Sequence, residues 1–230
     1  MKRYFIVVLI LFICIAGYAQ QELYSETRTV DQFDRVTASR GIEVIIDVGE
    51  SSTITVETND LNALNRIETV VRDGTLEINI GHGIRPKNLT ARVTISASQL
   101  SCIRSSSGAS ICTMGTLTGD NIEVSAGSGS HINLNLDAGI VECNSSAGSM
   151  VRLSGKTKNM EAHAGSGGVV EANELVSEKA YATASAGGIT NLNVNDELAA
   201  KASSGGSVVY TGEATITSKR QSGGGSIRKE

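Results

Sequence analysis

Aromatic side chains are scarce in this sequence. It has no tryptophan, and aromatic residues make up 3% of its 230 residues. Beyond residue 19 four aromatics remain: Tyr24, Phe33, Tyr181 and Tyr210. Because strand-binding grooves for nucleic acids stack bases on aromatic rings, this poverty argues against a nucleic-acid groove. It also argues against a tight sugar-stacking site.

Positive charge and cysteine are limited as well. The 20 basic residues are outnumbered by 24 acidic ones, and loss of Lys2 and Arg3 with a cleaved leader would lower the net charge from −4 to −6. That balance argues against nucleic acid or an anionic membrane as a partner. Beyond residue 19 only Cys102, Cys112 and Cys143 remain, which is no disulfide framework. We expect Cys143 in the core and the other two outward on different strands, where a bridge between them stays open as an alternative.

The first 19 residues have the features of a signal peptide. Lys2 and Arg3 are followed by an apolar run over 6–16, and small residues at Gly17 and Ala19 suit cleavage after Ala19. The run is short for a transmembrane helix. Ile13 before Cys14 disfavours a lipid anchor. The sequence therefore predicts export to the periplasm or the cell surface, with no transmembrane anchor after cleavage.

A short phrase of small residues around a glycine recurs along the second half of the chain. Its glycines are spaced by 18 to 21 residues: Gly108, Gly129, Gly148, Gly167, Gly187, Gly205 and Gly224. A repeat near twenty residues fits one coil of a β-solenoid. A flexible linker is disfavoured, because linkers do not interleave with apolar columns at a fixed period.

The residues that flank each glycine alternate between apolar and polar. Three positions after the glycines stand Ile111, Ile132, Val151, Val170, Thr190, Val208 and Ile227. Alternation with period two predicts strands with one buried face, and each glycine phrase is then the corner between two strands. We predict an all-β, right-handed parallel β-helix or β-solenoid with about seven regular coils over residues 101–230.

Residues 28–100 are rich in predicted strands but lack the glycine phrase. We expect strands at 53–58, 67–72, 75–80 and 89–97, a hairpin at Asp73-Gly74, a turn or short helical loop at 60–65, and a loop at 81–88. This part continues the same domain with less regular coils and caps its N-terminal end.

Several of these segments carry a family resemblance. They are Phe33-Asp-Arg-Val36, Gly41-Ile-Glu-Val-Ile-Ile46, Asp73-Gly-Thr-Leu-Glu-Ile78 and the serial Ser-Gly-Ala-Ser-like corners. With the export signal, they resemble the head GIN domain family, domains of unknown function described as autotransporter adhesins of Bacteroidetes-type bacteria. The resemblance covers residues 28–228. It implies a β-helical fold at the cell envelope and carries over no catalytic residue.

Two sets of polar residues are candidate binding sites. Glu123, Glu142 and Glu161 each lie six positions before a corner glycine, so successive coils would stack them about 4.8 Å apart. Such a ladder can bind Ca²⁺, or it can be an exposed column relieved by basic neighbours, which we favour. Asn133 and Asn191 belong to a second outward set that can hydrogen-bond glycans. The histidines lack zinc spacing, and we predict no metal site and no cofactor.

Two classes of function remain. The first is a non-enzymatic binding or structural module, adhesin-like, whose partner is a surface glycan or a protein, with oligomers able to form through the solenoid ends. The second is a polysaccharide lyase or hydrolase, since β-helices host such enzymes. No motif with catalytic spacing supports the second, and a fold alone does not license it. We therefore assign no catalytic residue.

Overall fold

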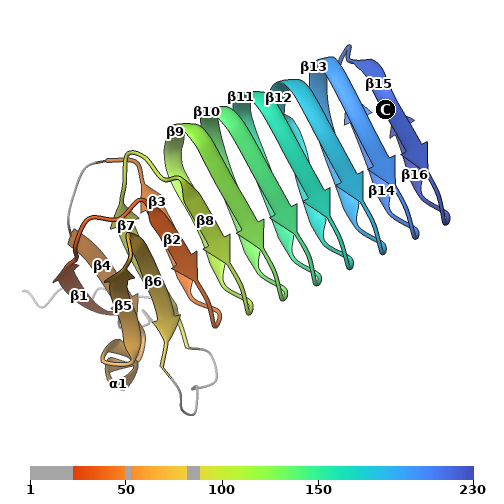
Figure 1. Cartoon of the computed structure of the whole chain (residues 1–230). Coiled ribbons are helices and arrows are strands. Elements are labelled where there is room, and N and C mark those ends of the chain that lie inside the picture. The colour runs from red at the N-terminus through yellow and green to blue at the C-terminus, as the bar shows by residue number, and fades with distance from the viewer. Residues whose placement is uncertain (1–22, 50–52, 82–88) are drawn as a thin grey trace, which may run out of the picture.

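The computed structural model describes residues 23–49, 53–81 and 89–230. These form one elongated β-solenoid of about seven turns with a wider N-terminal end (Figure 1). The predicted all-β solenoid is confirmed. The predicted signal peptide, residues 1–19, and most of the predicted loop at 81–88 lie outside the described residues.

The regular coils are built from long parallel strands. In chain order these are β9 (Ser110–Ala126), β10 (His131–Ser145), β11 (Met150–Ala164), β12 (Val169–Ala184) and β13 (Ile189–Ala202), followed by the shorter β14 (Ser207–Thr211), β15 (Thr215–Gln221) and β16 (Ser226–Lys229). Each long strand bends near its middle. A coil is therefore flattened, with two walls, a tight corner at one edge and a bend at the other (Figure 1).

The alternation expected from the sequence places every second side chain inside this flattened coil. Val124, Cys143 and Ala162 on successive coils are fully buried, whereas their neighbours in sequence face outward. The column that starts at Ile111 is buried throughout, including its one polar member, Thr190. The Thr190 hydroxyl has no hydrogen-bond partner among the described residues. Burial of these columns is the main stabilising contribution, since apolar surface leaves water on both walls.

The glycine corners are tight turns with two consecutive residues at positive φ. At one corner Ser166 has φ 49° and Gly167 has φ 71°, and the Gly168 amide donates to the carbonyl of Gly165 at 2.8 Å. Two central residues with positive φ define a type I′ turn, which glycine favours. The corners predicted from Gly108 to Gly224 are confirmed. The sequence did not indicate that the residue before each glycine adopts positive φ too, although six of the seven are serine or alanine.

Two short strands of the N-terminal part belong to the regular stack. They are β2 (Arg35–Ala38) and β3 (Glu43–Asp47), which pair in parallel with β8 (Cys102–Ser105) and β9. Arg40 and Gly41, with φ 61° and 66°, make the corner between them. The amide of Ser106 donates to the carbonyl of Ala38 at 3.0 Å, as corner residues of later coils do to the coil before.

The chain then leaves the stack and caps it. Beyond the β2–β3 coil lie β6 (Thr75–Ile80) on β2 and β7 (Ala91–Ser96) on β3, both parallel. Antiparallel strands complete this end: β5 (Ile67–Arg72) on β6, β4 (Thr53–Thr58) on β7 and β1 (Tyr24–Thr29) on β4. The chain returns as β8 on the other side of the β2–β3 coil. The antiparallel layer ends the parallel stack at the N-terminal side.

Two local predictions for the cap are confirmed. Asp73 and Gly74, with φ 49° and 74°, form the turn of the β5–β6 hairpin. The predicted short helical loop is the helix α1 (Leu61–Leu64), whose first turn is capped by the Asp60 carboxylate accepting from the Asn62 amide at 2.9 Å. Within the described residues no helix has the length and hydropathy needed to cross a membrane.

The three described cysteines are free thiols, so the alternative of a bridge between Cys102 and Cys112 is not realised. Cys143 lies in the core as expected, and burial raises the pKa of its thiol to about 12. Cys102 occupies an outward column but is only 7% exposed, because its register partners Arg35 and Glu123 have long side chains on either side of it. Burial also raises the pKa of Cys102 and of the half-buried Cys112.

Candidate functional site

The predicted glutamate ladder exists as a row of register partners on one wall. Glu123, Glu142 and Glu161 face one another across β9, β10 and β11. Arg104 Nη2 donates to the two carboxylate oxygens of Glu123 at 2.9 and 3.2 Å, and His163 Nε2 lies 2.8 Å from Glu161 Oε1. Neighbours from adjacent columns thus relieve the repulsion. Among the described residues no cluster of three or more His, Cys, Asp or Glu side chains is arranged to hold a metal ion.

The predicted asparagine set lies on the opposite wall and is interrupted. Asn133 and Asn191 share a column, but Arg152 and Glu171 stand between them on the intervening coils. Those two form an ion pair, with Nη2 and Oε2 2.5 Å apart. Asn133 lines a shallow hollow of about 200 Å³ and Asn191 a different one of about 460 Å³. The two asparagines therefore do not form one continuous glycan-binding surface.

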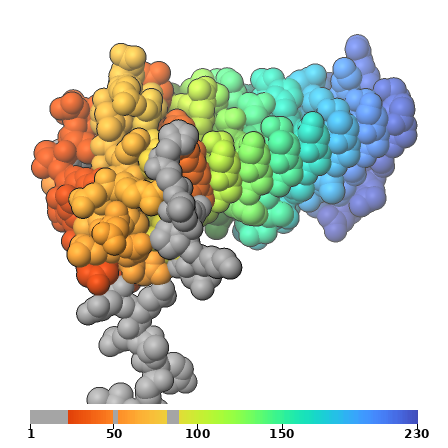
Figure 2. Space-filling model, turned by 90° about the horizontal axis from the view of Figure 1, so that it is seen from below, coloured from red at the N-terminus to blue at the C-terminus, as the bar shows by residue number. Residues whose placement is uncertain are grey.

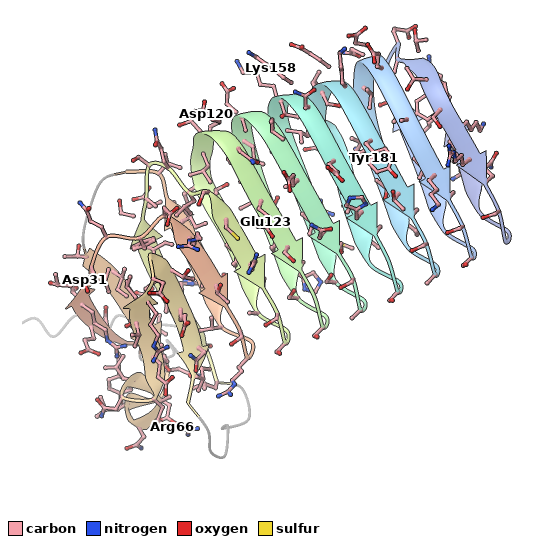
Figure 3. All side chains as sticks on the ribbon, viewed as in Figure 1. Asp31, Arg66, Asp120, Glu123, Lys158 and Tyr181 are labelled. Atoms are coloured by element: carbon pink, nitrogen blue, oxygen red, sulfur yellow. The ribbon has the colours of Figure 1, made fainter. Side chains whose placement is uncertain are left out.

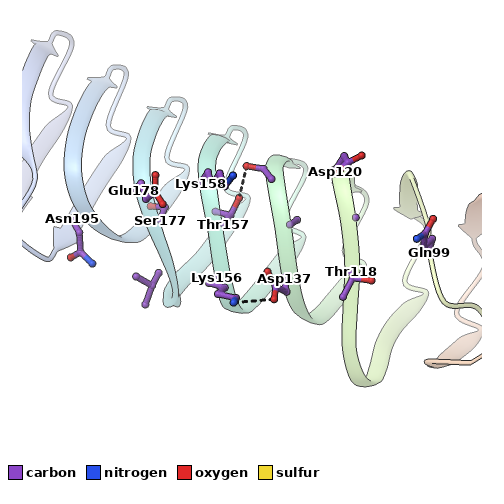
Figure 4. A pocket seen from close by; sticks show the side chains of 14 residues that line it. Gln99, Thr118, Asp120, Asp137, Lys156, Thr157, Lys158, Ser177, Glu178 and Asn195 are labelled. Atoms are coloured by element: carbon purple, nitrogen blue, oxygen red, sulfur yellow. Dashed lines mark hydrogen bonds and ion pairs between the residues drawn. The ribbon is translucent and has the colours of Figure 1, made fainter.

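One concavity follows the bends of the coils. This bend groove has a volume of about 780 Å³ and crosses five coils beside Gln99. Its lining residues are Gln99, Thr118, Gly119, Asp120, Asp137, Ala138, Gly139, Lys156, Thr157, Lys158, Val176, Ser177, Glu178 and Asn195. Figure 4 shows their side chains arranged along successive ribbons. The edge formed by the glycine corners instead presents regular, closely stacked rows (Figure 2).

The bend groove offers both hydrogen-bond donors and acceptors. Lys156 Nζ lies 3.1 Å from Asp137 Oδ2 of the preceding coil, and Thr157 Oγ1 donates to the carbonyl of Gly139 at 3.3 Å (Figure 4). Asp120, Lys158 and Glu178 add charges of both signs along the same edge. Two lysines and three carboxylates give the groove a mixed charge rather than one strong sign. Such a lining suits a polar ligand that extends across several coils.

Sequence reasoning did not identify the bend groove. Its residues lie eight to twelve positions after each corner glycine, in the segments 118–120, 137–139, 156–158 and 176–178. There the alternation of apolar and polar residues is interrupted by charged and small ones. This break, repeated at the period of the corners, is the signal that could have located the second edge of the coil.

The fold and the groove define a parallel β-solenoid whose surface suits binding. Residues 32–214 match the model of the family described as "Putative auto-transporter adhesin, head GIN domain". The match covers most of the chain, and the protein belongs to this family. No curated protein matches the chain.

Solved structures share the fold. A "putative adhesin" from Bacteroides fragilis has a TM-score of 0.82 at 22% identity, with 91% of this chain and 97% of that one covered. A "putative adhesin" from Parabacteroides merdae gives 0.75 at 17% identity, with 92% and 97% covered. A "putative lipid binding protein" from Parabacteroides distasonis gives 0.69 at 15% identity, with 92% and 98% covered. At these identities the likeness shows the fold alone.

Proposed function

We propose that this protein is exported to the cell envelope, where its regular coils bind an extended surface glycan without cleaving it. The observation that carries the proposal is the bend groove, which crosses five coils and is lined by hydroxyl, amide, carboxylate and ammonium groups. Membership of a family described as adhesins supports a binding role. The charged and apolar features of residues 1–19 support export.

A polymer fits this groove better than a small molecule does. Equivalent positions recur at the strand spacing of about 4.8 Å, but their side chains differ, as in the column Thr118, Asp137, Lys156 and Val176. A polymer that crosses the coils can therefore make several different polar contacts. Each contact is weak, because the charged side chains of the groove are exposed to solvent. Several contacts made by one chain of sugars reinforce one another through effective concentration.

The groove gives less support to catalysis. Glycoside hydrolysis needs a pair of carboxylates held at a set separation around one bond. Here the Asp137 carboxylate is engaged by Lys156, and the charged residues are spread over successive coils. A lyase would need a base beside a cation, and no cation-holding cluster is found among the described residues. A lyase or hydrolase remains the alternative that the test separates.

The test asks whether the protein retains a polysaccharide without converting it to products. The protein is incubated with a panel of neutral and acidic polysaccharides, with and without Ca²⁺, while co-sedimentation, reducing ends and unsaturated-uronate absorbance are measured. We expect retention of at least one polysaccharide and no product. The groove-blocking variants Thr118→Tyr and Asn195→Tyr should reduce retention, whereas Lys201→Tyr, at an exposed site outside the groove, should not.

Other outcomes overturn the proposal. Product formation would replace it with the lyase or hydrolase function. Retention that is unaffected by both groove-blocking variants would show that the polysaccharide binds outside the bend groove. Failure to retain any polysaccharide would contradict glycan binding and favour a protein partner.

A further inference from the structure

One aromatic ring is exposed on the wall that carries the glutamate column. Tyr181 takes the position on β12 that Glu161 takes on β11, and it is 43% exposed (Figure 3). The other described aromatics, Tyr24, Phe33 and Tyr210, are partly buried. On the next coil Ala199 stands in the same column and leaves one side of the ring open.

The ring of Tyr181 is held by its neighbours. His163 meets it edge to face, with ring centroids 5.9 Å apart and planes at 72°. His163 is itself hydrogen-bonded to Glu161 at 2.8 Å. An edge-to-face contact is a favourable aromatic geometry, and a ring ordered before binding loses less entropy when a ligand arrives. Tyr181 is therefore a fixed platform rather than a loose surface side chain.

A hollow of about 310 Å³ lies beside this ring. Apolar side chains from Ile140, Met160, Ala180 and Ala199 line it, and Ile140 is itself 40% exposed. Its polar groups are Asn159, Glu161, Lys179, Glu197 and Thr217. An apolar lining with a few placed polar groups is the usual composition of a small-ligand site. We call this set, with Tyr181, the Tyr181 hollow.

The Tyr181 hollow adjoins the bend groove along the same coils. The groove ends at Gly139, Lys158 and Glu178, and the hollow begins at the next residues, Ile140, Asn159 and Lys179. Figure 3 places Lys158 above the bends and Tyr181 on the wall below them. A glycan in the groove can therefore extend a residue or a branch onto the ring.

We propose that the Tyr181 hollow is a subsite for an uncharged pyranose, which stacks on the Tyr181 ring; this inference rests on the proposed glycan-binding function. A pyranose has an apolar face of C–H groups and a rim of hydroxyls. The face matches the ring and the apolar lining. The hydroxyls match the Asn159 amide and the Glu161 and Glu197 carboxylates, which accept hydrogen bonds.

The charges around the hollow disfavour an acidic sugar. Two carboxylates, Glu161 and Glu197, face one ammonium group, Lys179, whose Nζ is 2.7 Å from Glu197 Oε1. The cation is thus already neutralised, and a uronate, sulfate or phosphate would meet the remaining negative charge of Glu161. A neutral sugar is not repelled by this carboxylate.

The test uses neutral gluco-, manno- and chito-oligosaccharides, with an oligogalacturonate as the acidic probe, and titration calorimetry with the whole protein. For the best neutral probe, Tyr181→Ala should weaken binding by about tenfold or more. Ala199→Leu, which fills the hollow and keeps the ring, should do the same. Tyr181→Phe should bind within about threefold of wild type. Glu123→Gln, in the same column but outside the hollow, is the matched control.

A second readout does not depend on the variants' affinity. The chain has five tyrosines, so labelled ring resonances are few, and Tyr181→Phe assigns the one that matters. We expect the Tyr181 ring signals to shift on adding the neutral probe while those of Tyr24 and Tyr210 do not.

Two results would overturn the subsite and leave the proposed function standing. They are unchanged affinity of Tyr181→Ala with no shift of the Tyr181 ring, and tighter binding of the galacturonate than of every neutral probe. Absence of binding to all glycans by the wild type would overturn the subsite together with the proposed function.

Discussion

Gly168 lies so close to Ser145 of the preceding coil that a Cβ atom on Gly168 would stand 2.3 Å from the Ser145 carbonyl oxygen. Gly188, Gly206 and Gly225 have the same relation to the coil before them, at 2.3 to 2.4 Å. One coil before Gly168, the equivalent position is Ser149, whose hydroxyl donates to the equivalent carbonyl, of Ala126, at 2.8 Å. The corners from Gly167 on thus contain two different glycine requirements, one of space and one of backbone angle.

The requirement of space predicts the effect of Gly168→Ala. The added methyl meets backbone atoms that move only if two coils move, so we expect a loss of about 1–3 kcal/mol in the free energy of unfolding. Denaturant unfolding measures it. An unchanged midpoint would show that the corner relaxes freely.

The requirement of angle applies to the neighbouring Gly167. It has φ 71° with open space around its α-carbon, so only backbone strain opposes a side chain. Gly167→Val should cost about 1–3 kcal/mol. Gly167→Asn should cost much less, because asparagine tolerates positive φ. Equal losses for valine and asparagine in denaturant unfolding would contradict a purely conformational cause.

A stabilising substitution is expected at Thr190. Its buried hydroxyl lacks a partner among the described residues, while the same column holds valine or isoleucine on the other coils. Thr190→Val removes the desolvated hydroxyl with little change of shape, so stability should rise by about 1 kcal/mol. For a chain of this size that raises Tm by about 2–4 °C. A lower Tm would indicate a partner for the hydroxyl in solution.

Stability should fall at alkaline pH because of Cys143. Its thiol has a pKa of about 12 in the folded protein, above the value of about 8.5 for an unfolded chain. The stabilisation from this pKa difference is complete below about pH 8.5 and is lost as the pH rises toward 12, and the loss by pH 10 is about 1–2 kcal/mol. Denaturant unfolding at pH 8 and pH 10 should show a smaller decline for Cys143→Ala than for wild type. An equal fall in the free energy of unfolding for both proteins would contradict the attribution of the alkaline instability to Cys143.

Export is tested at the N-terminus. Expression in a Gram-negative host, followed by intact-mass measurement of the exported product, should give a chain that begins at Gln20. A soluble cytoplasmic product that retains residues 1–19 would be the contrary result.

The sequence predicted the repeated part of the fold because its signal is periodic. The corners from Gly108 to Gly224 combine a small-residue phrase with apolar columns, and both follow from packing one coil on the next. The corner at Gly41 was not predicted, for two reasons. It reads Ser-Arg-Gly-Ile, without the small residues, and the inserted cap separates it from Gly108 by 67 residues. The pairing of one coil with another depends on residues far apart in the sequence, and local spacing does not reveal it.

The candidate site was predicted less completely. The register of Glu123, Glu142 and Glu161 followed from their spacing. The expected basic neighbours engage two of them, Arg104 at Glu123 and His163 at Glu161. Asn133 and Asn191 were grouped by type, although an Arg152–Glu171 pair divides their column. Tyr181 stands in the glutamate column in the sequence itself. Its value as a platform depends on the open side left by Ala199 and the contact with His163, which require three coils to be placed together.

Carboxyl footprinting tests the central claim most directly, namely that an extended glycan lies along the bend groove. The protein is treated with a carbodiimide and an amine, with and without the polysaccharide that it retains, and modification is mapped by mass spectrometry. We expect Asp120, Asp137 and Glu178 to react more slowly in the complex, while Glu171 on the opposite wall and Glu77 in the cap keep their rates. Unchanged rates at all three groove carboxylates, with protection at Glu171 or Glu77 instead, would contradict the account.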